Sequence, residues 1–495
     1  MTAIPAAFGI AVDRDTKQLD DRTLWGGSPA RVLRLSALGA AAWRELGAAG
    51  VRSPASGVLA RRLTDAGLAH PRPPEIDTDF DVTVLIPVRD RADALDRCLS
   101  ALGHAHRVIV VDDGSADGPA VAQVAHRHGA TVVRRARNGG PAAARNSGLF
   151  DVRAEFVALL DSDCVPTPDW IAQLAPHFAD PLVAAVAPRV VALVDGPSRV
   201  ARFGARFGSL DLGTREARVA PGTRVAYVPT AALVVRRAAL DQIARDGAVF
   251  DDAMRVGEDV DLVWRLHDAG WRIRFDPSAI VRHDEPTSWA ALLARRYRYG
   301  TSAGPLAVRH PASMAPVVLS ALPVATAVSV LARRPLFAAA SFAASVLTTA
   351  RTLRIAELPT TGVVPACASA VRDTWLGIGR YACQFAAPAL VAGCAIGGRR
   401  RWGRRAALTG LLLAPAFAPS RGSGRVDAAT RVVGRLLDDV AYGAGVWVGC
   451  VRARTTVPLR PDVRLRPLRR LPRDRHRCAA PGHSMPVTMA RRDSS

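Results

Sequence analysis

Short apolar runs alternate with amphipathic segments between residues 81 and 161, and this is the most regular pattern in the chain. The runs have the length and composition of buried strands, and the segments between them have the period of helices. The predicted strands are 82–87, 107–111, 131–134 and 156–160, and the predicted helices are 92–102, 121–128 and 142–149. Strands and helices that alternate in this way predict an α/β domain with a mostly parallel sheet covered on both faces.

Residues 1–78 form a smaller N-terminal unit with a different pattern. Ser36 can cap a first helix, and a second amphipathic segment, 58–66, ends at Gly67. Two short helices after a β-rich start predict a small winged-helix-like module. This module is similar to the peptide-binding modules that accompany enzymes modifying ribosomal peptides; a structural cap on the next domain is the alternative interpretation.

The pattern changes again in residues 306–450, which contain long uncharged stretches. The apolar runs are 315–332, 335–350, 381–398 and 406–419. Each falls a little short of the roughly 20 residues of a spanning helix, and arginine clusters beside them would stay on the cytoplasmic side. The region therefore predicts membrane-associated helices, with a soluble helical bundle as the alternative. Residues 451–495 are rich in arginine and proline and predict a disordered basic tail.

A net charge of +22 is typical of proteins that bind nucleic acids or anionic membranes. The distribution of the charge along this chain favours membranes over nucleic acids. The arginines are spread along the chain and cluster beside apolar segments, Lys17 is the only lysine, and basic residues do not alternate with aromatic ones. We therefore expect no nucleic-acid partner. The seven cysteines form no C-x-x-C pair, which excludes a zinc ribbon and indicates a reducing compartment. The N-terminus does not have the pattern of a signal peptide.

Candidate chemistry lies at the ends of the predicted strands. Asp112 and Asp113 follow the second strand, and Asp161 and Asp163 follow the fourth. Ligands of α/β sheets bind at the carboxyl ends of strands, and a D-x-D pair offers oxygen ligands to a divalent metal that carries phosphates. A solvated polar loop is the alternative for this pair. The chain lacks the glycine-rich turn of a dinucleotide site and the G-K-S/T of a P-loop, which disfavours hydride transfer and ATP hydrolysis.

A third pair of acids, Glu258 and Asp259, precedes a segment that is helical from Val260. Acids in a first helical turn interact favourably with the helix dipole, so capping is one explanation. The other is general base catalysis, in which a carboxylate takes the proton of an incoming hydroxyl.

Five motifs together resemble family 2 glycosyltransferases of the GT-A fold, over roughly residues 80–300. They are I-P-V-R at 86–89, V-D-D-G-S at 111–115, N-G-G-P-A-A-A-R-N-S-G at 138–148, D-S-D at 161–163 and G-E-D-V-D-L at 257–262. The resemblance implies a nucleotide-sugar-binding domain over residues 79–305. It also implies an inverting, metal-dependent transfer of a hexose from a UDP-sugar, with Mg²⁺ or Mn²⁺ as cofactor.

The resemblance also assigns roles to individual residues. Asp259 is the implied general base, with Glu258 beside it. The implied metal ligands are Asp163, Asp161 and His283. The implied nucleotide-sugar contacts are Pro87, Arg89, Asp112, Asp113, Asn138, Arg145 and Asp161. The chain departs from processive members at their Q-x-x-R-W motif, where it has R-R-Y-R-Y at 295–299. Tyr297 or Tyr299 is then the candidate for stacking on the acceptor, and long-chain processivity is not implied.

The whole layout is similar to the glycosyltransferases of the mycofactocin system. That family decorates a peptide-derived redox cofactor with a short β-1,4-linked glucose chain from UDP-glucose. The resemblance implies a UDP-sugar donor and a peptide-derived small-molecule acceptor. The apolar runs and their arginines add a membrane lipid as a partner and place the chain at the cytoplasmic membrane, with the catalytic domain facing the cytoplasm. The alternatives are a cell-envelope or polyprenyl-phosphate glycosyltransferase and, in another class, a non-catalytic binding or scaffold protein.

Overall fold

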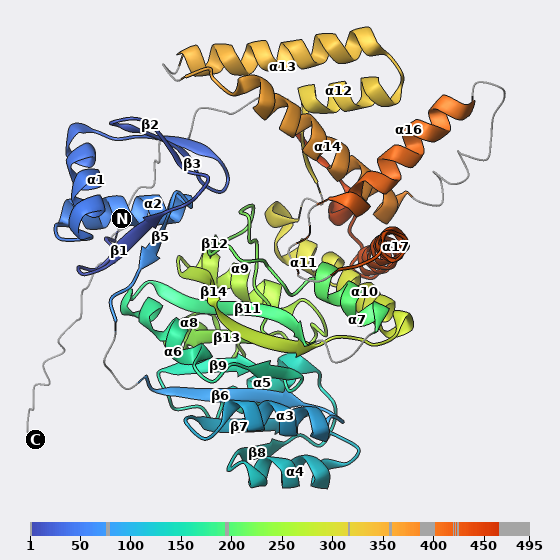
Figure 1. Ribbon diagram of the computed structural model, residues 1–495. Coiled ribbons are helices and arrows are strands. Elements are labelled where there is room, and N and C mark those ends of the chain that lie inside the picture. The colour runs from blue at the N-terminus through green and yellow to red at the C-terminus, as the bar shows by residue number, and fades with distance from the viewer. Residues whose placement is uncertain are drawn as a thin grey trace, which may run out of the picture.

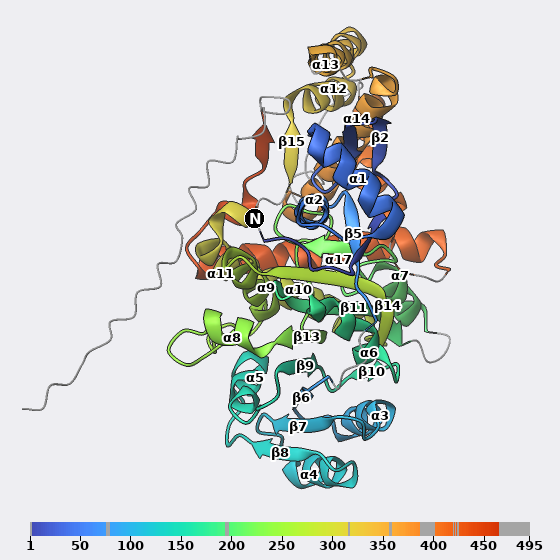
Figure 2. The same ribbon diagram turned by 90° about the vertical axis from the view of Figure 1, so that its left-hand side faces the viewer.

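The computed structural model describes residues 2–75, 80–193, 198–314, 317–355, 359–386, 401–418, 420, 422 and 425–464. In both views the sheet domain forms one end of the molecule (Figures 1 and 2). The N-terminal module and the C-terminal helices both lie on the other side, away from the strand pair β7 and β8. The apolar run predicted at 381–398 and the predicted tail are described only up to residues 386 and 464.

The N-terminal module contains two short sheets and two helices around its own apolar core. Its elements are β1 Gly9–Val12, β2 Lys17–Asp20, β3 Thr23–Gly26, β4 Arg31–Arg34, α1 Ala37–Ala49, α2 Pro54–Ala66 and β5 Ala69–Arg72. The Ser36 hydroxyl accepts a hydrogen bond from the Gly39 amide and caps α1 as expected. A buried ion pair between Arg61 and Asp180, 2.6 Å long, fixes the module to the next domain.

The sheet domain is built on nine strands in the order β10-β14-β11-β13-β9-β6-β7-β8, with β12 paired to β14. The strands are β6 Val82–Val88, β7 Arg107–Asp112, β8 Thr131–Arg134, β9 Phe156–Leu160, β10 Cys164–Pro166, β11 Val183–Leu193, β12 Ala217–Val219, β13 Ala232–Arg236 and β14 Arg272–Asp284. The strands β9, β6, β7 and β8 are parallel, as the alternating pattern predicts. Beyond them the sheet is mixed, because β13 runs antiparallel to both β9 and β11.

Helices cover both faces of this sheet, and each face has its own apolar core. The helices α3 Ala92–Leu102, α4 Gly118–Arg127 and α6 Trp170–Leu174 pack on one face. The helices α5 Pro141–Leu149, α8 Arg237–Ile243 and α9 Glu258–Asp268 pack on the other. The helix α7 Arg199–Phe207 and the 3₁₀ turn η1 Ala175–Ala179 complete the domain.

The C-terminal region is helical and packs against the sheet domain through α10 Trp289–Thr301 and α17 Ala428–Arg452. The other elements are α11 Ala303–Arg309, η2 Pro311–Ser313, β15 Val318–Ser320, α12 Ala321–Leu331, α13 Pro335–Ile355, α14 Val363–Phe385, α16 Arg401–Leu413, η3 Ala414–Phe417, η4 Val457–Leu459 and β16 Asp462–Arg464. In the described part of the chain, one helix is long and apolar enough to cross a membrane. It spans Pro335–Arg354, has a mean hydropathy of 1.3 and is almost entirely unburied.

Candidate active site

A cavity of about 2130 Å³ opens at the carboxyl ends of β6, β7 and β9 and extends to the C-terminal helices. It brings together most of the site residues predicted from the sequence. Those that line it are Pro87, Arg89, Asp113, Asn138, Arg145, Asp161, Asp163, Glu258, Asp259, His283 and Tyr299. Among the described residues, Asp112 and Tyr297 are the predicted site residues that do not line it.

Asp112 and Asp113 have different surroundings although they are adjacent. Asp112 is fully buried, where it accepts hydrogen bonds from the Ser115 amide at 2.8 Å and from Arg134 at 2.6 Å. Asp113 lines the cavity, and its two oxygens accept hydrogen bonds from the amides of Gly139 and Gly140 at 2.9 and 2.7 Å. Asp112 therefore fixes the turn after β7, while Asp113 fixes the glycine loop that precedes α5.

Arg145 joins two of the predicted acidic sites. It lies on α5, is 2% exposed, and donates hydrogen bonds to Asp161 at 2.6 Å and to Glu258 at 2.8 Å. Burial raises the pKa of Asp161, and the nearby Arg145 opposes that rise. A buried guanidinium between two carboxylates holds the end of β9 and the first turn of α9 in a fixed relation. In this structure Arg145 is a positioning residue.

Asp163 and His283 lie together because β10 pairs antiparallel with β14, which sets Cys164 opposite His283. His283 Nε2 is 3.5 Å from Asp163 Oδ1. The other Asp163 oxygen accepts a hydrogen bond from Arg91 at 2.5 Å. A carboxylate and an imidazole thus face the same space, with a cation beside them.

Asp163 and His283 fit a divalent cation whose coordination is completed by oxygens of the substrate and water. No group of three or more His, Cys, Asp or Glu side chains able to hold a metal ion occurs among the described residues. Mg²⁺ and related ions are often held by one or two protein side chains together with substrate phosphates and water. The carboxylate and imidazole donors of Asp163 and His283 match that arrangement. Asp161 differs from them, because its carboxylate is held by Arg145.

Glu258 and Asp259, the first two residues of α9, are distinguished by their partners. Glu258 is 8% exposed and neutralised by Arg145. Asp259 lines the cavity, and its side chain accepts a hydrogen bond only from the Val260 amide, with no cation paired to it in the described part of the chain. Burial and the charge of Glu258 raise the pKa of Asp259 to about 7. Asp259 is therefore the carboxylate available for proton transfer near neutral pH.

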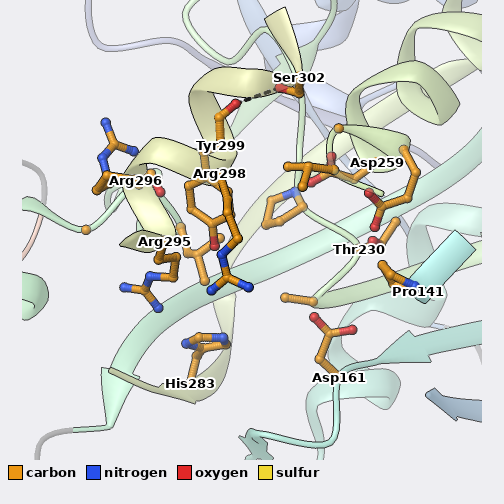
Figure 3. Close-up of a pocket in the computed structure, with 18 of the residues that line it drawn as sticks. Pro141, Asp161, Thr230, Asp259, His283, Arg295, Arg296, Arg298, Tyr299 and Ser302 are labelled. Atoms are coloured by element: carbon orange, nitrogen blue, oxygen red, sulfur yellow. Dashed lines mark hydrogen bonds between the residues drawn. The ribbon is translucent and has the colours of Figure 1, made fainter. Parts of the chain in front are cut away.

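The two tyrosines predicted to contact the acceptor lie on different sides of α10. Tyr299 lines the cavity, and its backbone carbonyl accepts a hydrogen bond from the Ser302 hydroxyl at 2.7 Å (Figure 3). Tyr297 does not line the cavity, and its backbone carbonyl lies against Gly445 of α17. Residues two apart are separated by about 200° around a helix axis, which places the two tyrosines on opposite sides of α10.

Sequence reasoning missed the arginines of α10 that line the cavity. Figure 3 shows Asp161 and Asp259 on one side and Arg295, Arg296 and Arg298 on the other, with the Arg298 side chain extending into the space near His283. The spacing of Arg295 and Arg298 could have indicated that both face the same side, because residues three apart share a helix face. Arg91, which contacts Asp163, was also missed.

Comparisons with known proteins agree with the motifs. Residues 83–243 match the family described as glycosyl transferase family 2. The chain is 42% identical over 477 residues to the pre-mycofactocin glycosyltransferase of Mycobacterium tuberculosis (strain H37Rv), which covers 94% of this chain and 99% of that protein. It is 31% identical over 225 residues to the succinoglycan biosynthesis protein ExoO of Rhizobium meliloti, covering 42% of this chain and 61% of that one.

A solved structure similar to this chain is the mannosyltransferase PcManGT of Pyrobaculum calidifontis in complex with GDP-Man and Mn²⁺. The likeness has a TM-score of 0.35 and 20% identity, and it covers 69% of this chain and 90% of that one.

Proposed function

This chain belongs to the pre-mycofactocin glycosyltransferases within glycosyl transferase family 2, and on that premise we propose the reaction it catalyses. The enzyme transfers glucose from UDP-glucose, with inversion, to a hydroxyl group of a mycofactocin precursor, a peptide-derived redox cofactor. It then extends the product as a short β-linked oligosaccharide.

The observation that carries this proposal is the carboxylate of Asp259 in the cavity, which forms no ion pair with any residue that the structure describes. Its neighbour Glu258 is bound to Arg145, whereas Asp259 faces the space between the sheet edge and α10. A general base has to be within hydrogen-bond reach of the hydroxyl that it deprotonates, and its pKa has to lie near the working pH. Asp259 meets the second condition and lines the cavity that would admit such a hydroxyl.

The transfer is a single displacement at the anomeric carbon. As the acceptor hydroxyl oxygen forms a bond to that carbon, its proton passes to Asp259 and the carbon–oxygen bond to the diphosphate breaks. The electron pair of the broken bond leaves with UDP. Because attack and departure occur on opposite faces of the sugar, an α-linked donor gives a β-linked product.

The residues at the opposite end of the cavity suit the leaving group. Asp163 and His283 would hold a divalent cation, Mg²⁺ or Mn²⁺, which when bound supplies charge neutralisation for the diphosphate. Arg91 beside Asp163 and Arg298 on α10 add positive charge from the protein itself. Asp113 and Gly140 line the part of the cavity at the end of β7, where the nucleoside fits.

We also propose that the enzyme works at the cytoplasmic face of a membrane. The helix Pro335–Arg354 exposes large apolar side chains, among them Leu336 at 83% and Phe337 at 64%. Arginines lie at both of its ends, including Arg333, Arg334 and Arg351. An exposed apolar helix flanked by arginines fits an anionic lipid surface.

The function is tested by measuring UDP release from a panel of UDP-sugars. The purified, detergent-solubilised chain is incubated with Mn²⁺ or Mg²⁺ and UDP-glucose, UDP-galactose or UDP-N-acetylglucosamine, with and without a mycofactocin precursor. We expect release from UDP-glucose to rise at least about tenfold with that acceptor and to be lost in Asp259→Asn.

Two outcomes would redirect the proposal. Release that ignores the mycofactocin precursor but responds to a polyprenyl phosphate would keep the site and move the function to the cell envelope. Binding of UDP-sugars without any transfer, in the wild type and in Asp259→Asn alike, would favour a binding protein.

A further inference from the structure

The cavity is larger than a nucleotide-sugar requires. Pockets for molecules of that size typically occupy about 300–1,000 Å³, whereas this cavity has about 2130 Å³. The residues assigned to the donor lie at the edge of the sheet. The remaining wall comes from α10, α14 and α17, which lie beyond the segment that matches the family. Figures 1 and 2 both show α17 alongside α10, with α14 extending from it.

The helix α17 presents one face to the cavity. Arg435, Tyr442 and Val446 line it, at intervals of seven and four residues, which return to the same side of a helix. The buried Asp438 and Asp439 lie between them. These two acids hold arginines of the neighbouring helices, so the position of this wall is fixed.

The two ion pairs join three helices around the cavity. Asp438 contacts Arg296 of α10 at 2.6 Å, and Asp439 contacts Arg380 of α14 at 3.1 Å. Gln384 of α14 also donates a hydrogen bond to Asp439 at 2.8 Å. Arg296 and Arg380 are thus each paired with a carboxylate, which neutralises most of their charge. Their guanidinium groups remain planar hydrogen-bond donors in the cavity wall.

Aromatic rings gather in the same place. The chain has five tyrosines, and four of them line this cavity: Tyr227, Tyr299, Tyr381 and Tyr442. Three of the four come from α10, α14 and α17. The Tyr442 ring lies against the Arg296 guanidinium, with 5.2 Å between the guanidinium carbon and the ring centroid, and the Tyr381 ring packs edge-on against Phe385.

This combination has a specific chemical match. A pyranose ring presents C–H groups on its faces and hydroxyls around its edge, so it fits between aromatic faces and planar donors such as guanidinium and amide groups. We propose that α14 and α17 form an acceptor subsite for the sugar chain already attached to the acceptor, with Tyr442 as its stacking residue. The inference rests on the proposed function, because it assigns the subsite to that same transfer reaction.

The subsite is tested by direct binding of a soluble sugar chain. The probe is cellotetraose, a β-1,4-linked tetramer of glucose, titrated calorimetrically into the full detergent-solubilised chain in the presence of UDP and Mn²⁺. We expect wild type to bind it and Tyr442→Ala to bind it about tenfold more weakly. Tyr442→Phe keeps the ring and retains binding. The control is Trp447→Ala, which removes a 48% exposed aromatic of the same helix that does not line the cavity.

UDP affinity, measured in the same samples, separates the two proposals. Equal cellotetraose binding by wild type and Tyr442→Ala, or no binding by a wild type that still binds UDP, would overturn the subsite and leave the donor site intact. A wild type that does not bind UDP would refute the proposed function, whereas Tyr442-dependent cellotetraose binding in that case would still support the subsite. Unchanged UDP affinity in Tyr442→Ala shows that the variant is folded.

Discussion

At the scale of single residues, neighbouring carboxylates are given different properties by their partners. Glu258 is neutralised by Arg145, while Asp259 forms no ion pair with a described residue and has an elevated pKa. In the same way, Asp112 is turned into the protein and Asp113 toward the cavity. Successive side chains near the end of a strand point to opposite sides, which accounts for the second pair. Adjacent acids therefore have different surroundings at both positions, set by the groups that each side chain contacts.

The elevated pKa of Asp259 predicts how activity depends on pH. A general base acts only when it is deprotonated, so activity falls as the pH drops below its pKa of about 7. We expect kcat/KM for the acceptor to fall about tenfold for each pH unit below that value. The measurement is a pH profile between 5 and 9, with UDP affinity followed in parallel as the control. A flat profile from pH 5.5 to 8 would show that Asp259 is not the base.

Asp163 is predicted to be the residue on which metal-dependent binding depends. Asp163→Ala removes the carboxylate that faces His283, so the stimulation of UDP binding by Mn²⁺ should be lost. The measurement is UDP affinity with Mn²⁺ and with EDTA. The matched control is Asp169→Ala, a nearby carboxylate that does not line the cavity. Full Mn²⁺-stimulated affinity in Asp163→Ala would move the metal site elsewhere.

At the scale of elements, the crossing of α10 and α17 depends on glycine. A side chain at Gly445 would overlap the Tyr297 carbonyl, and one at Gly304 of α11 would overlap the carbonyl of Gly449. The helices approach so closely that only a hydrogen fits between their backbones. This contact holds α17 against α10, and residues of both helices line the cavity.

Gly445→Ala is therefore expected to destabilise the protein, although alanine favours helices. Overpacking of this kind typically costs about 1–3 kcal/mol. Gly47→Ala on α1 is the control, because nothing lies within 4 Å of the added methyl group, and it should raise stability by about 0.5–1 kcal/mol. Thermal unfolding of the two variants makes the comparison. An unchanged melting temperature in Gly445→Ala would contradict the close crossing.

The elements that could be predicted from the sequence are those built by local patterns. The parallel strands and their helices follow from short βαβ units, and α3 begins and ends at the predicted residues, Ala92 and Leu102. The insertion of β13 between β9 and β11 could not be predicted, because it pairs Phe156 with Arg236, eighty residues away. The part of the cavity wall formed by α14 and α17 could not be predicted either, because ion pairs between helices far apart in the sequence hold it in place.

In the candidate site, too, the residues that could be predicted are those that belong to local sequence motifs. Residues carried by compact motifs, such as Asp163 and Asp259, line one cavity as expected. The position of Arg298 and the turning away of Tyr297 depend on how α10 rotates against α17. That rotation is decided by packing rather than by any local pattern.

At the scale of the whole molecule, α13 packs against α12 and α14 but leaves large apolar side chains exposed. On α13, Leu336, Phe337 and Leu347 are 83%, 64% and 68% exposed. Isolated exposed apolar residues are common, but several on one long helix beside arginines mark an interaction surface. A lipid surface is the partner that we propose for it.

Vesicle flotation tests this partner. We expect the full chain to float with vesicles that contain anionic lipid and to float less with purely zwitterionic ones. The double substitution Leu336→Gln and Phe337→Gln should reduce flotation about tenfold or more, because it removes two large apolar groups. Phe150→Gln is the control, since Phe150 is 78% exposed on the sheet domain. Equal flotation of all variants would contradict a lipid role for α13.

The central claim is that Asp259 is the base of a glycosyl transfer in this cavity, and Asp259→Asn tests it most directly. The substitution keeps the size of the side chain. It should not lower stability at pH 8: the pKa of Asp259 is raised on folding, so its ionisation above the ordinary value near 4 destabilises the folded state.

The measurement compares UDP affinity and glucose transfer in wild type and Asp259→Asn at pH 8 with Mn²⁺. We expect UDP affinity to stay within about twofold and transfer to fall by about 10²–10⁴-fold, the usual contribution of a general base. Transfer at the wild-type rate in Asp259→Asn would contradict the account and direct attention to Glu258.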